Sequence, residues 1–307
     1  MITYLHLARF PKVFVSMTGL RIDEFDSLVD EVSPLYAAAE QKRLSRRDRQ
    51  RRIGGGHPFE LSLVDRMLLT VIWLRRYPTQ EVLGYLFGVS DSSALRYVAA
   101  ILPLLEQSGR DTMRMPDPGK HQRRSLDALL SDTPALAVVI DTFEQRIQRP
   151  SDHDVADTYY SGKKKQHTLK SQIAVNEVTG EIVEVAESVR GPTADIKVLE
   201  ASELMSRLPK GVGGIGDLAY IGIDKLNPDR QGAAPRRKPR GQPRPADDVA
   251  YNTAFSRRRI VVEHTIRRVR CYESLTHSDR HHRCGHTTRV RAVAGLVNRQ
   301  IGQRMAH

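Results

Sequence analysis

The sequence predicts an α/β protein whose N-terminal third is helical and whose remainder is built around a sheet. Up to about Gln107, apolar residues recur every three to four positions, which is the period of a helix that packs on one side. From Leu136 onward the pattern becomes that of strands, first a continuous apolar run and then alternating runs. The change follows a basic stretch that contains prolines, so we expect two domains, 1–110 and 135–307, joined by a linker over 111–134.

Charge and cysteine content narrow the setting. Lys and Arg number 48 against 36 Asp and Glu, a formal net charge of +12, which favours a polyanionic partner such as nucleic acid over a merely solvated basic surface. Only Cys271 and Cys284 are present, so we expect no disulfide framework and a reducing cytoplasm. The longest apolar run, Met67 to Leu74, is too short to cross a bilayer, and the first residues lack the pattern of a secretory signal. We therefore expect no membrane association.

Two amphipathic helices are expected early in the chain. The segment RIDEFDSLVDEV carries the first, with Thr18 as its cap, and LSLVDRMLLTVIWLRR carries the second. Between them, Lys42 to Gly56 is dense in charge and ends in glycines, so it is either a solvated linker or an arm that contacts nucleic-acid phosphates. In the second interpretation the contacts come from Arg46, Arg47, Arg49, Arg51 and Arg52.

The stretch from Thr79 to Ala100 has the layout of a helix-turn-helix. Gly88 permits the turn and Ser90 can cap the second helix. The apolar residues expected to pack the pair together are Val82, Leu83, Leu86, Ala94, Leu95 and Val98. The residues left facing outward, toward a DNA major groove, are Asp91, Ser92, Ser93 and Arg96. The alternative is two packed helices that do not touch DNA.

The second part of the chain mixes strands and helices. Residues 136–140, LAVVI, are expected to form a buried central strand that ends at Asp141. The alternation within 170–189 predicts a β-hairpin. A helix is expected over 193–208, followed by a short strand that leads into Asp217. This order of three strands, a helix, a strand and further helix resembles the ribonuclease H-like α/β fold.

Glu263 is expected on a helix. Val262, Ile266 and Val269 form an apolar stripe at helical spacing, and the basic residues on the adjoining edge are Arg259, Arg267 and Arg270. Ordinary helix ion pairs are one explanation of this edge. The preceding stretch 229–245 is rich in Pro, Gly and Arg and is expected to be an irregular basic loop.

Asp141, Asp217 and Glu263 are thus three carboxylates at the ends or edges of apolar segments in a basic chain. Each has a plain explanation alone, since an Asp after a strand is often a turn former or a helix cap. Together they predict a metal site, because carboxylate oxygens bind Mg²⁺ and two such ions, about 3.5–4 Å apart, can hold the attacking and leaving oxygens of a phosphodiester.

Four segments carry a more specific pattern. They are IDTFEQRIQRP at 140–150, YYSGKKKQHTLK at 159–170, GDLAYIG at 216–222 and YNTAFSRRRIVVEHTIRRVR at 251–270. In their order and spacing they resemble the motifs of bacterial insertion-sequence transposases of the DDE class, in the group similar to eukaryotic Harbinger transposases. Relatives usually read Asp-Gly-Thr-Glu in the first segment, where this chain has Thr142 and Phe143, and a glycine where Ala219 stands.

The resemblance implies a DNA transposase with Asp141, Asp217 and Glu263 as a catalytic triad that holds two Mg²⁺ or Mn²⁺ ions. Water would cut at the transposon end, and the freed 3′-hydroxyl would then attack target DNA. The partners implied are double-stranded DNA, both terminal inverted repeats and target, and at least a second copy of the chain. The DNA contacts implied come from Lys163, Lys164, Lys165, Arg259, Arg267 and Arg270, with Glu144 and His167 as supporting groups.

Other functions stay open at this point. A DNA-binding regulator descended from a transposase would share the arm and the helix-turn-helix but lack cleavage, and a stand-alone nuclease would cut without joining ends. A zinc site is disfavoured, because the residues that invite it lack paired ligand spacing. These residues are Cys271, His281, His282, Cys284 and His286.

Overall fold

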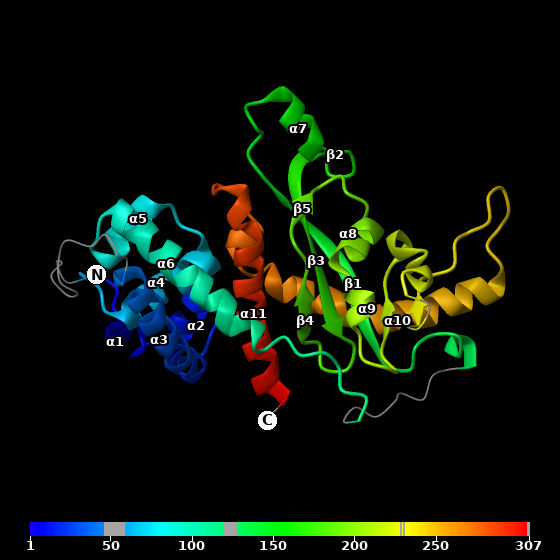
Figure 1. Ribbon diagram of the computed structural model, residues 1–307, viewed down its shortest axis with the longest axis horizontal. Helices are drawn as coiled ribbons and strands as arrows, with labels where there is room; N and C mark the ends of the chain where they lie inside the picture. Colours follow the sequence, from blue (N-terminus) through cyan, green and yellow to red (C-terminus); the bar gives the residue numbers. More distant parts are fainter. Residues whose placement is uncertain (46–58, 120–127, 228, 230, 306–307) are drawn as a thin grey trace.

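A computed structural model of the chain describes residues 1–45, 59–119, 128–227, 229 and 231–305. A body of N-terminal helices lies beside an α/β body, and the last helix runs between the two (Figure 1). The N-terminal helices are α1 (Tyr4–Leu7), α2 (Pro11–Thr18), α3 (Ile22–Leu44), α4 (Leu63–Arg76), α5 (Gln80–Phe87) and α6 (Asp91–Arg110).

The expected helix-turn-helix is present as α5 and α6. Thr79 and Ser90 cap the two helices through their side chains, and Gly88 adopts the left-handed conformation (φ 69°) that the tight turn needs. Two packing predictions were wrong, since Val82 and Leu95 are nearly half exposed, at 48% and 47%. The buried stripes of α5 and α6 run one position away from these residues, so both side chains stand on the outer face.

The first long helix begins elsewhere than expected. Thr18 does not cap α3 but ends α2, where its buried hydroxyl donates to the Phe14 carbonyl oxygen and accepts from Leu20 N–H. Arg21 precedes α3, and the Glu24 carboxylate accepts its backbone N–H at 2.7 Å. The helix therefore starts with a capping interaction made by its own third residue.

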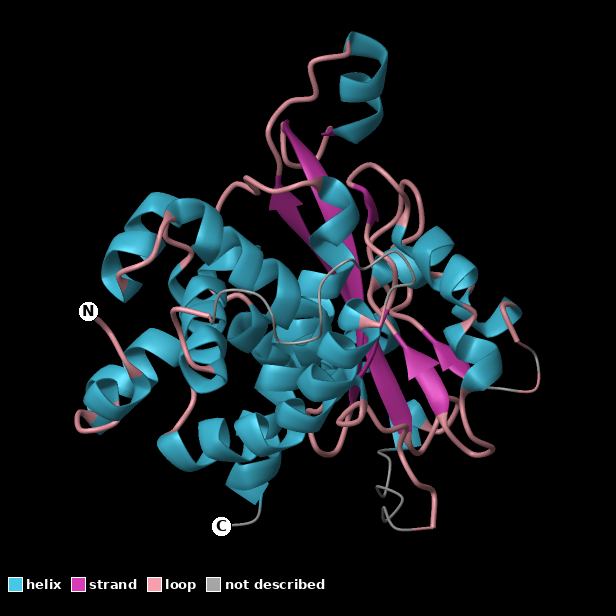
Figure 2. Ribbon diagram, turned by 60° about the vertical axis from the view of Figure 1, so that its left-hand side comes forward, coloured by secondary structure: helices cyan, strands magenta, loops and turns pink. Residues whose placement is uncertain are grey.

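The sheet is mixed and surrounds one long strand (Figure 2). Its strands are β1 (Ala137–Arg146), β2 (Tyr160–Ser161), β3 (Gln166–Asn176), β4 (Ile182–Val185), β5 (Val189–Arg190), β6 (Gly213–Ile215) and β7 (Gly232–Ala233). β1 is antiparallel to β3 and parallel to β6, while β2, β4 and β5 pair with β3. The expected hairpin is confirmed as β3 and β4.

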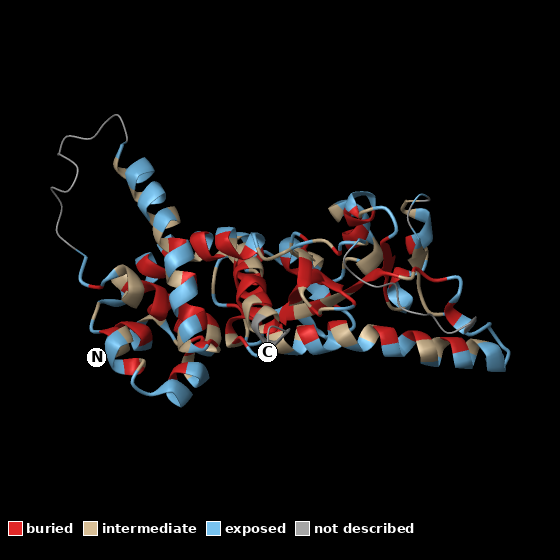
Figure 3. Ribbon diagram, turned by 90° about the horizontal axis from the view of Figure 1, so that it is seen from below, coloured by how far each residue is buried: buried red, intermediate tan, exposed pale blue. Residues whose placement is uncertain are grey.

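The remaining helices cover both faces of the sheet. They are α7 (His153–Tyr159), α8 (Asp195–Ser202), α9 (Leu204–Arg207), α10 (Ala246–Val269) and α11 (His286–Met305), with short 3-10 helices at Ala128–Leu130, Leu218–Tyr220, Ile223–Lys225, Glu273–Leu275 and Arg283–Gly285. Helices α8 and α9 pack on one face, while α10 and α11 pack on the other. Seen from below, long helix α10 is buried on the sheet side and exposed on the other (Figure 3).

Two expected elements differ in extent. The strand over 136–140 does not end at Asp141 but continues to Arg146, because β3 pairs with it along nine positions. The helix expected over 193–208 is broken at Glu203, whose φ of 54° ends α8 before α9 begins. Both differences come from tertiary context that a local pattern does not contain.

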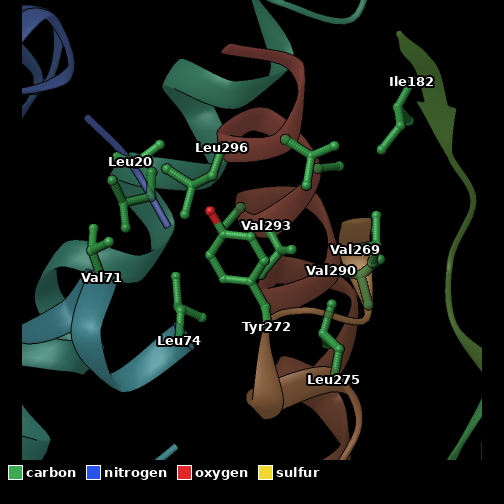
Figure 4. Close-up of a cluster of buried hydrophobic side chains, with 14 of the residues drawn as sticks. Leu20, Val71, Leu74, Ile182, Val269, Tyr272, Leu275, Val290, Val293 and Leu296 are labelled. Atoms are coloured by element: carbon green, nitrogen blue, oxygen red, sulfur yellow. The ribbon is translucent and has the colours of Figure 1, made fainter. Parts of the chain in front are cut away.

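One apolar core joins the helical body to the α/β body. Leu20, in the turn before α3, and Val71 and Leu74 of α4 meet Tyr272 and Val293 from the C-terminal segment (Figure 4). Helices α6 and α11 also contact each other closely. The core contains residues from both sides of the expected linker, 111–134. This packing does not test the domain bounds expected from the sequence, which stay a prediction. Across the described ranges, no helix is long and apolar enough to cross a membrane.

Buried ion pairs tie distant segments together. Arg258 of α10 pairs with Glu177 at 2.6 Å and donates to the Pro134 carbonyl oxygen, which holds α10 to the start of the sheet. Arg289 of α11 pairs with Asp279, which also accepts a hydrogen bond from Tyr77 at the end of α4. Removing one partner of such a pair leaves an unpaired buried charge and is strongly destabilising.

The crossing of α6 and α11 predicts opposite effects for two glycines. A methyl group at Gly295 would overlap Gly109 Cα, so Gly295→Ala should force the helices apart and lower the free energy of unfolding by about 2 kcal/mol. In the same helix, a methyl group at Gly302 meets only Glu181 Oε1 at 3.6 Å. Gly302→Ala should therefore raise the free energy of unfolding by up to about 1 kcal/mol. Urea titrations of both variants measure this, and equal effects would contradict the close crossing.

Candidate active site

The acidic pair Asp141 and Asp217 lies where β1 outlasts its parallel neighbour. β6 ends at Ile215, which is opposite Val139, whereas β1 continues to Arg146. Asp141 and Asp217 each lie two residues beyond this last pair. If the pairing register is continued by two residues, the two aspartates lie side by side on the same face of the sheet. The sheet therefore brings together two carboxylates that are separated by 76 positions, 141 to 217, in the chain.

Asp141 is held in a confined, acidic environment. Its side chain is 20% exposed, and it accepts the Thr142 backbone N–H at 2.8 Å. Burial raises the pKa of Asp141 to about 6; the Thr142 hydrogen bond and Arg259 oppose the rise, while the charges of Asp217 and Asp195 add to it. A cation bound between these carboxylates would relieve their mutual repulsion.

Asp217 is positioned by the turn that follows β6. Its carboxylate accepts the Ala219 backbone N–H at 2.8 Å and so caps the 3-10 helix Leu218–Tyr220. Beneath it Tyr220 is fully buried, and its hydroxyl donates to Gln172 Oε1 at 3.2 Å. Burial, with the nearby charges of Asp195 and Asp141, raises the pKa of Tyr220. This tyrosine therefore stays neutral and supports the floor of the site.

The residues at which this chain departs from the DDE motifs have structural explanations. Phe143 is 6% exposed and belongs to the apolar core shared with the N-terminal helices, so a large side chain fits there. Thr142 and Ala219 provide, through their backbones, the N–H groups that bond the two aspartates. Those backbone contacts do not require a glycine.

Glu263 lines the same cleft as Asp141, from α10. It is exposed, and within the described part of the chain no hydrogen bond or ion pair holds it. No three His, Cys, Asp or Glu side chains among the described residues are grouped closely enough to hold a metal ion. The structure thus brings Asp141 and Asp217 together and places Glu263 on the wall of the cleft, without completing a set of three.

Asp195 and Lys170 belong to the cleft, although neither was expected there from sequence. Lys170 of β3 is 7% exposed, and its Nζ contacts Asp195 Oδ1 at 2.6 Å and the Thr193 carbonyl oxygen. The pair fixes the start of α8 against the sheet beside Asp141. No local pattern marked this lysine, since Thr168, Ser171 and Gln172 around it are also polar. A buried lysine needs an acidic partner, and here that partner comes from α8.

The expected basic residues reach the cleft to different extents. Lys163, Lys164 and Arg270 line it, and Lys165 lies beside them at the exposed end of the β2–β3 hairpin. Arg259 approaches Asp141, at 4.0 Å, rather than Glu263. Glu144 also lines the cleft, where it accepts a hydrogen bond from Thr168. Arg267 and His167 lie outside the cleft lining: Arg267 is exposed on α10, and His167 packs against the Tyr160 ring.

The residues expected to contact a major groove lie at the start of α6. Ser92 and Arg96 are exposed, while Ser93 is half-buried and hydrogen-bonded to Ser90. The five arm residues Arg46, Arg47, Arg49, Arg51 and Arg52 lie outside the described residues. Both cysteines are exposed, and His286 is buried between Ser188 and Gln145.

Comparisons with known proteins agree with this arrangement. A family model described as a DDE superfamily endonuclease matches residues 140–298, slightly more than half of the chain, and a model described as the helix-turn-helix of that superfamily matches 59–111. The chain is 28% identical over 291 residues, 94% of each chain, to a protein named as a probable transposase for insertion sequence element IS702 of Microchaete diplosiphon. It is 26% identical over 221 residues, 72% of this chain and 73% of the other, to a protein named as a putative transposase for insertion sequence element IS112 of Streptomyces albus G. The expected likeness to Harbinger transposases is not tested by these matches and stays a prediction.

The raised pKa of Asp141 predicts a pH-dependent effect on stability. The pKa of this carboxyl is about 6 in the folded protein and 3.8 ordinarily. Ionising Asp141 therefore lowers the free energy of unfolding increasingly as the pH rises from about 4 to 6, and the loss is complete above that range. Asp141→Asn should raise the free energy of unfolding at pH 7.5 by roughly 2–3 kcal/mol without metal, and by nothing below pH 4. Urea titrations across this range measure the difference. Asp30→Asn, at an exposed position of α3, is the matched control and should show no such profile.

Proposed function

The chain belongs to the DDE superfamily of endonucleases, and we propose that it is a DNA transposase, which cuts at the ends of its own element and joins the freed 3′-hydroxyl to target DNA. The observation that carries the proposal is the adjacency of Asp141 and Asp217 beyond the end of β6, with Glu263 on the wall of the same cleft. A helix-turn-helix in the same chain supports DNA as the substrate.

The donor chemistry of the cleft fits divalent cations. Asp141, Asp217 and Glu263 offer only carboxylate oxygens, which Mg²⁺ and Mn²⁺ accept, and crowding of negative charge around Asp141 favours a bound cation. A pair of ions would supply activation of the attacking oxygen and stabilisation of the leaving oxygen. Glu263 is exposed and has no fixed partner among the described residues, so it is the member of the set whose side chain can reorient.

The basic residues at the cleft bind and orient the DNA. Lys163, Lys164 and Arg270 hold the backbone near the scissile phosphate, because they line the same cleft as Asp141 and Glu263. Arg259 lies 4.0 Å from Asp141 and holds its carboxylate in place, while Lys165 and Arg267 contact phosphates farther along the backbone. Lys170 keeps Asp195 paired, so that this fourth acid does not compete for the cation.

Recognition of the element ends belongs to the N-terminal domain, residues 1–110. Ser92, Ser93 and Arg96 at the start of α6 face the major groove, and the arginines of the arm contact phosphates. Because two ends must be joined to one target, the working complex contains at least two copies of the chain. The reaction takes place in a bacterial cytoplasm.

Mutation of the acids should separate cleavage from binding. Asp141→Asn, Asp217→Asn and Glu263→Gln should each lower Mg²⁺-dependent nicking and strand transfer by more than about a hundredfold, because even losing a group that merely supports a metal ligand costs about 10- to 100-fold. Affinity for a duplex carrying the terminal inverted repeat should be retained. Gel assays of labelled end DNA measure both.

Glu187→Gln is the matched control, because this carboxylate is 73% exposed and lies outside the cleft. Wild-type protein that binds the repeat but never cuts it, with Mg²⁺ or with Mn²⁺, would indicate a regulator instead. Cutting without joining would indicate a nuclease.

The arm should control the salt dependence of DNA binding. Replacing Arg46, Arg47, Arg49, Arg51 and Arg52 by Gln should flatten the plot of log affinity against log salt by about 0.9 for each phosphate that the arm no longer neutralises. Fluorescence anisotropy at several salt concentrations measures the slope. Lys42 to Leu44 already belong to α3, and an unchanged slope would assign the rest of the expected arm, up to Gly56, to a solvated linker.

A further inference from the structure

Three segments far apart in the chain meet at one tyrosine ring. Tyr159 ends α7, Arg190 lies in β5, and Arg283 begins the 3-10 helix that precedes α11. The guanidinium carbons of Arg190 and Arg283 lie 5.5 Å and 4.7 Å from the Tyr159 ring centroid. The sum of these distances bounds their separation at about 10 Å, so two cations are concentrated at one point of the surface.

Neither arginine has an acidic partner within the part of the chain that the structure describes. Arg283 Nη1 is buried and has no hydrogen-bond acceptor there. A buried donor without an acceptor is destabilising, so the arrangement is unfavourable until an acceptor arrives. Packing against the ring would need only one guanidinium, and the second adds repulsion.

Arg280, close to Arg283 in the sequence, is an arginine whose hydrogen bonds are all explained by a structural role. Arg280 also stacks on a tyrosine, with its guanidinium carbon 4.2 Å from the Tyr77 centroid. Its donors, however, bond the backbone carbonyl oxygens of Tyr77 and Pro78. Arg280 is therefore satisfied within the protein, whereas Arg283 is not.

The position of this cluster indicates the ligand. Figure 1 shows the start of α11 between the α5–α6 pair and the protrusion formed by α7 and β2, and the β2–β3 hairpin carries the cleft residues Lys163 and Lys164. A duplex bound by both the helix-turn-helix and the cleft would have to span this region. Guanidinium groups are suited to phosphate oxygens through paired hydrogen bonds.

We propose that Arg190 and Arg283, oriented by the Tyr159 ring, bind a phosphodiester of the end DNA between the segment read by the helix-turn-helix and the cleavage site. This site rests on the proposed function for its substrate, but its chemistry is separate from the acidic cleft. Arg190→Gln and Arg283→Gln should each lower affinity for end DNA about tenfold, since a hydrogen bond to a charged group contributes about that much. Tyr159→Phe keeps the ring and should have no effect.

Single neutral methylphosphonates placed along the end duplex locate the contact. At one position between the two regions, the substitution should weaken binding by wild-type protein but not weaken Arg283→Gln further. Additive effects at every position would overturn the proposal. Arg110→Gln, which removes an exposed charge paired with Glu106, is the matched control. Its effect on affinity should add to that of the methylphosphonate at every position.

Salt dependence on a random duplex provides a second measurement that does not require cleavage or end recognition. Each of Arg190→Gln and Arg283→Gln should reduce the slope of log affinity against log salt by about 0.9. Lower thermal stability with an unchanged slope in both variants would show a purely structural role and overturn the proposal. A wild-type protein that does not prefer end DNA would count against the proposed function, while the slopes would still decide the phosphate site.

Discussion

The structure depends on the unequal lengths of β1 and its parallel neighbour. β3 supports β1 along nine paired positions, whereas β6 pairs with it at only three. From Ile140 to Gln145, β1 therefore has β3 as its one paired strand among the described residues, and Asp141 and Asp217 come together at its other edge. A longer β6 would place backbone pairing where the cleft is, and a β1 that stopped at Asp141 would leave this carboxylate on an unsupported loop.

Burial gives the acidic pair its electrostatic character. Asp141 is mostly enclosed, so desolvation raises its pKa to about 6, and the charges of Asp217 and Asp195 act in the same direction. Arg259 opposes part of this rise in the pKa of Asp141. It lies on α10, the helix that also carries Glu263. Holding the pair costs folding free energy that cation binding would return, which is the expected trade between stability and function at such sites.

The C-terminal segment links this site to the N-terminal helices. Helix α11 packs closely on α6 through Gly295 and Gly109, and Tyr272 lies in the core shared with the N-terminal helices. Through Arg289, α11 is also paired with Asp279, which accepts a hydrogen bond from the Tyr77 hydroxyl. The helix-turn-helix and the cleft are thus parts of one packed unit.

Local sequence patterns determined most element types and the helix-turn-helix, because periodicity, caps and turn glycines act over a few residues. Glu263 could be placed on its helix from Val262 and Val269 alone, since an apolar stripe at helical spacing must face a core. Only the tertiary structure decided that β1 passes through Asp141 and that Lys170 neutralises Asp195 beside it. These depend on which strands and helices become neighbours, and that choice is made by packing between segments separated by tens to hundreds of residues.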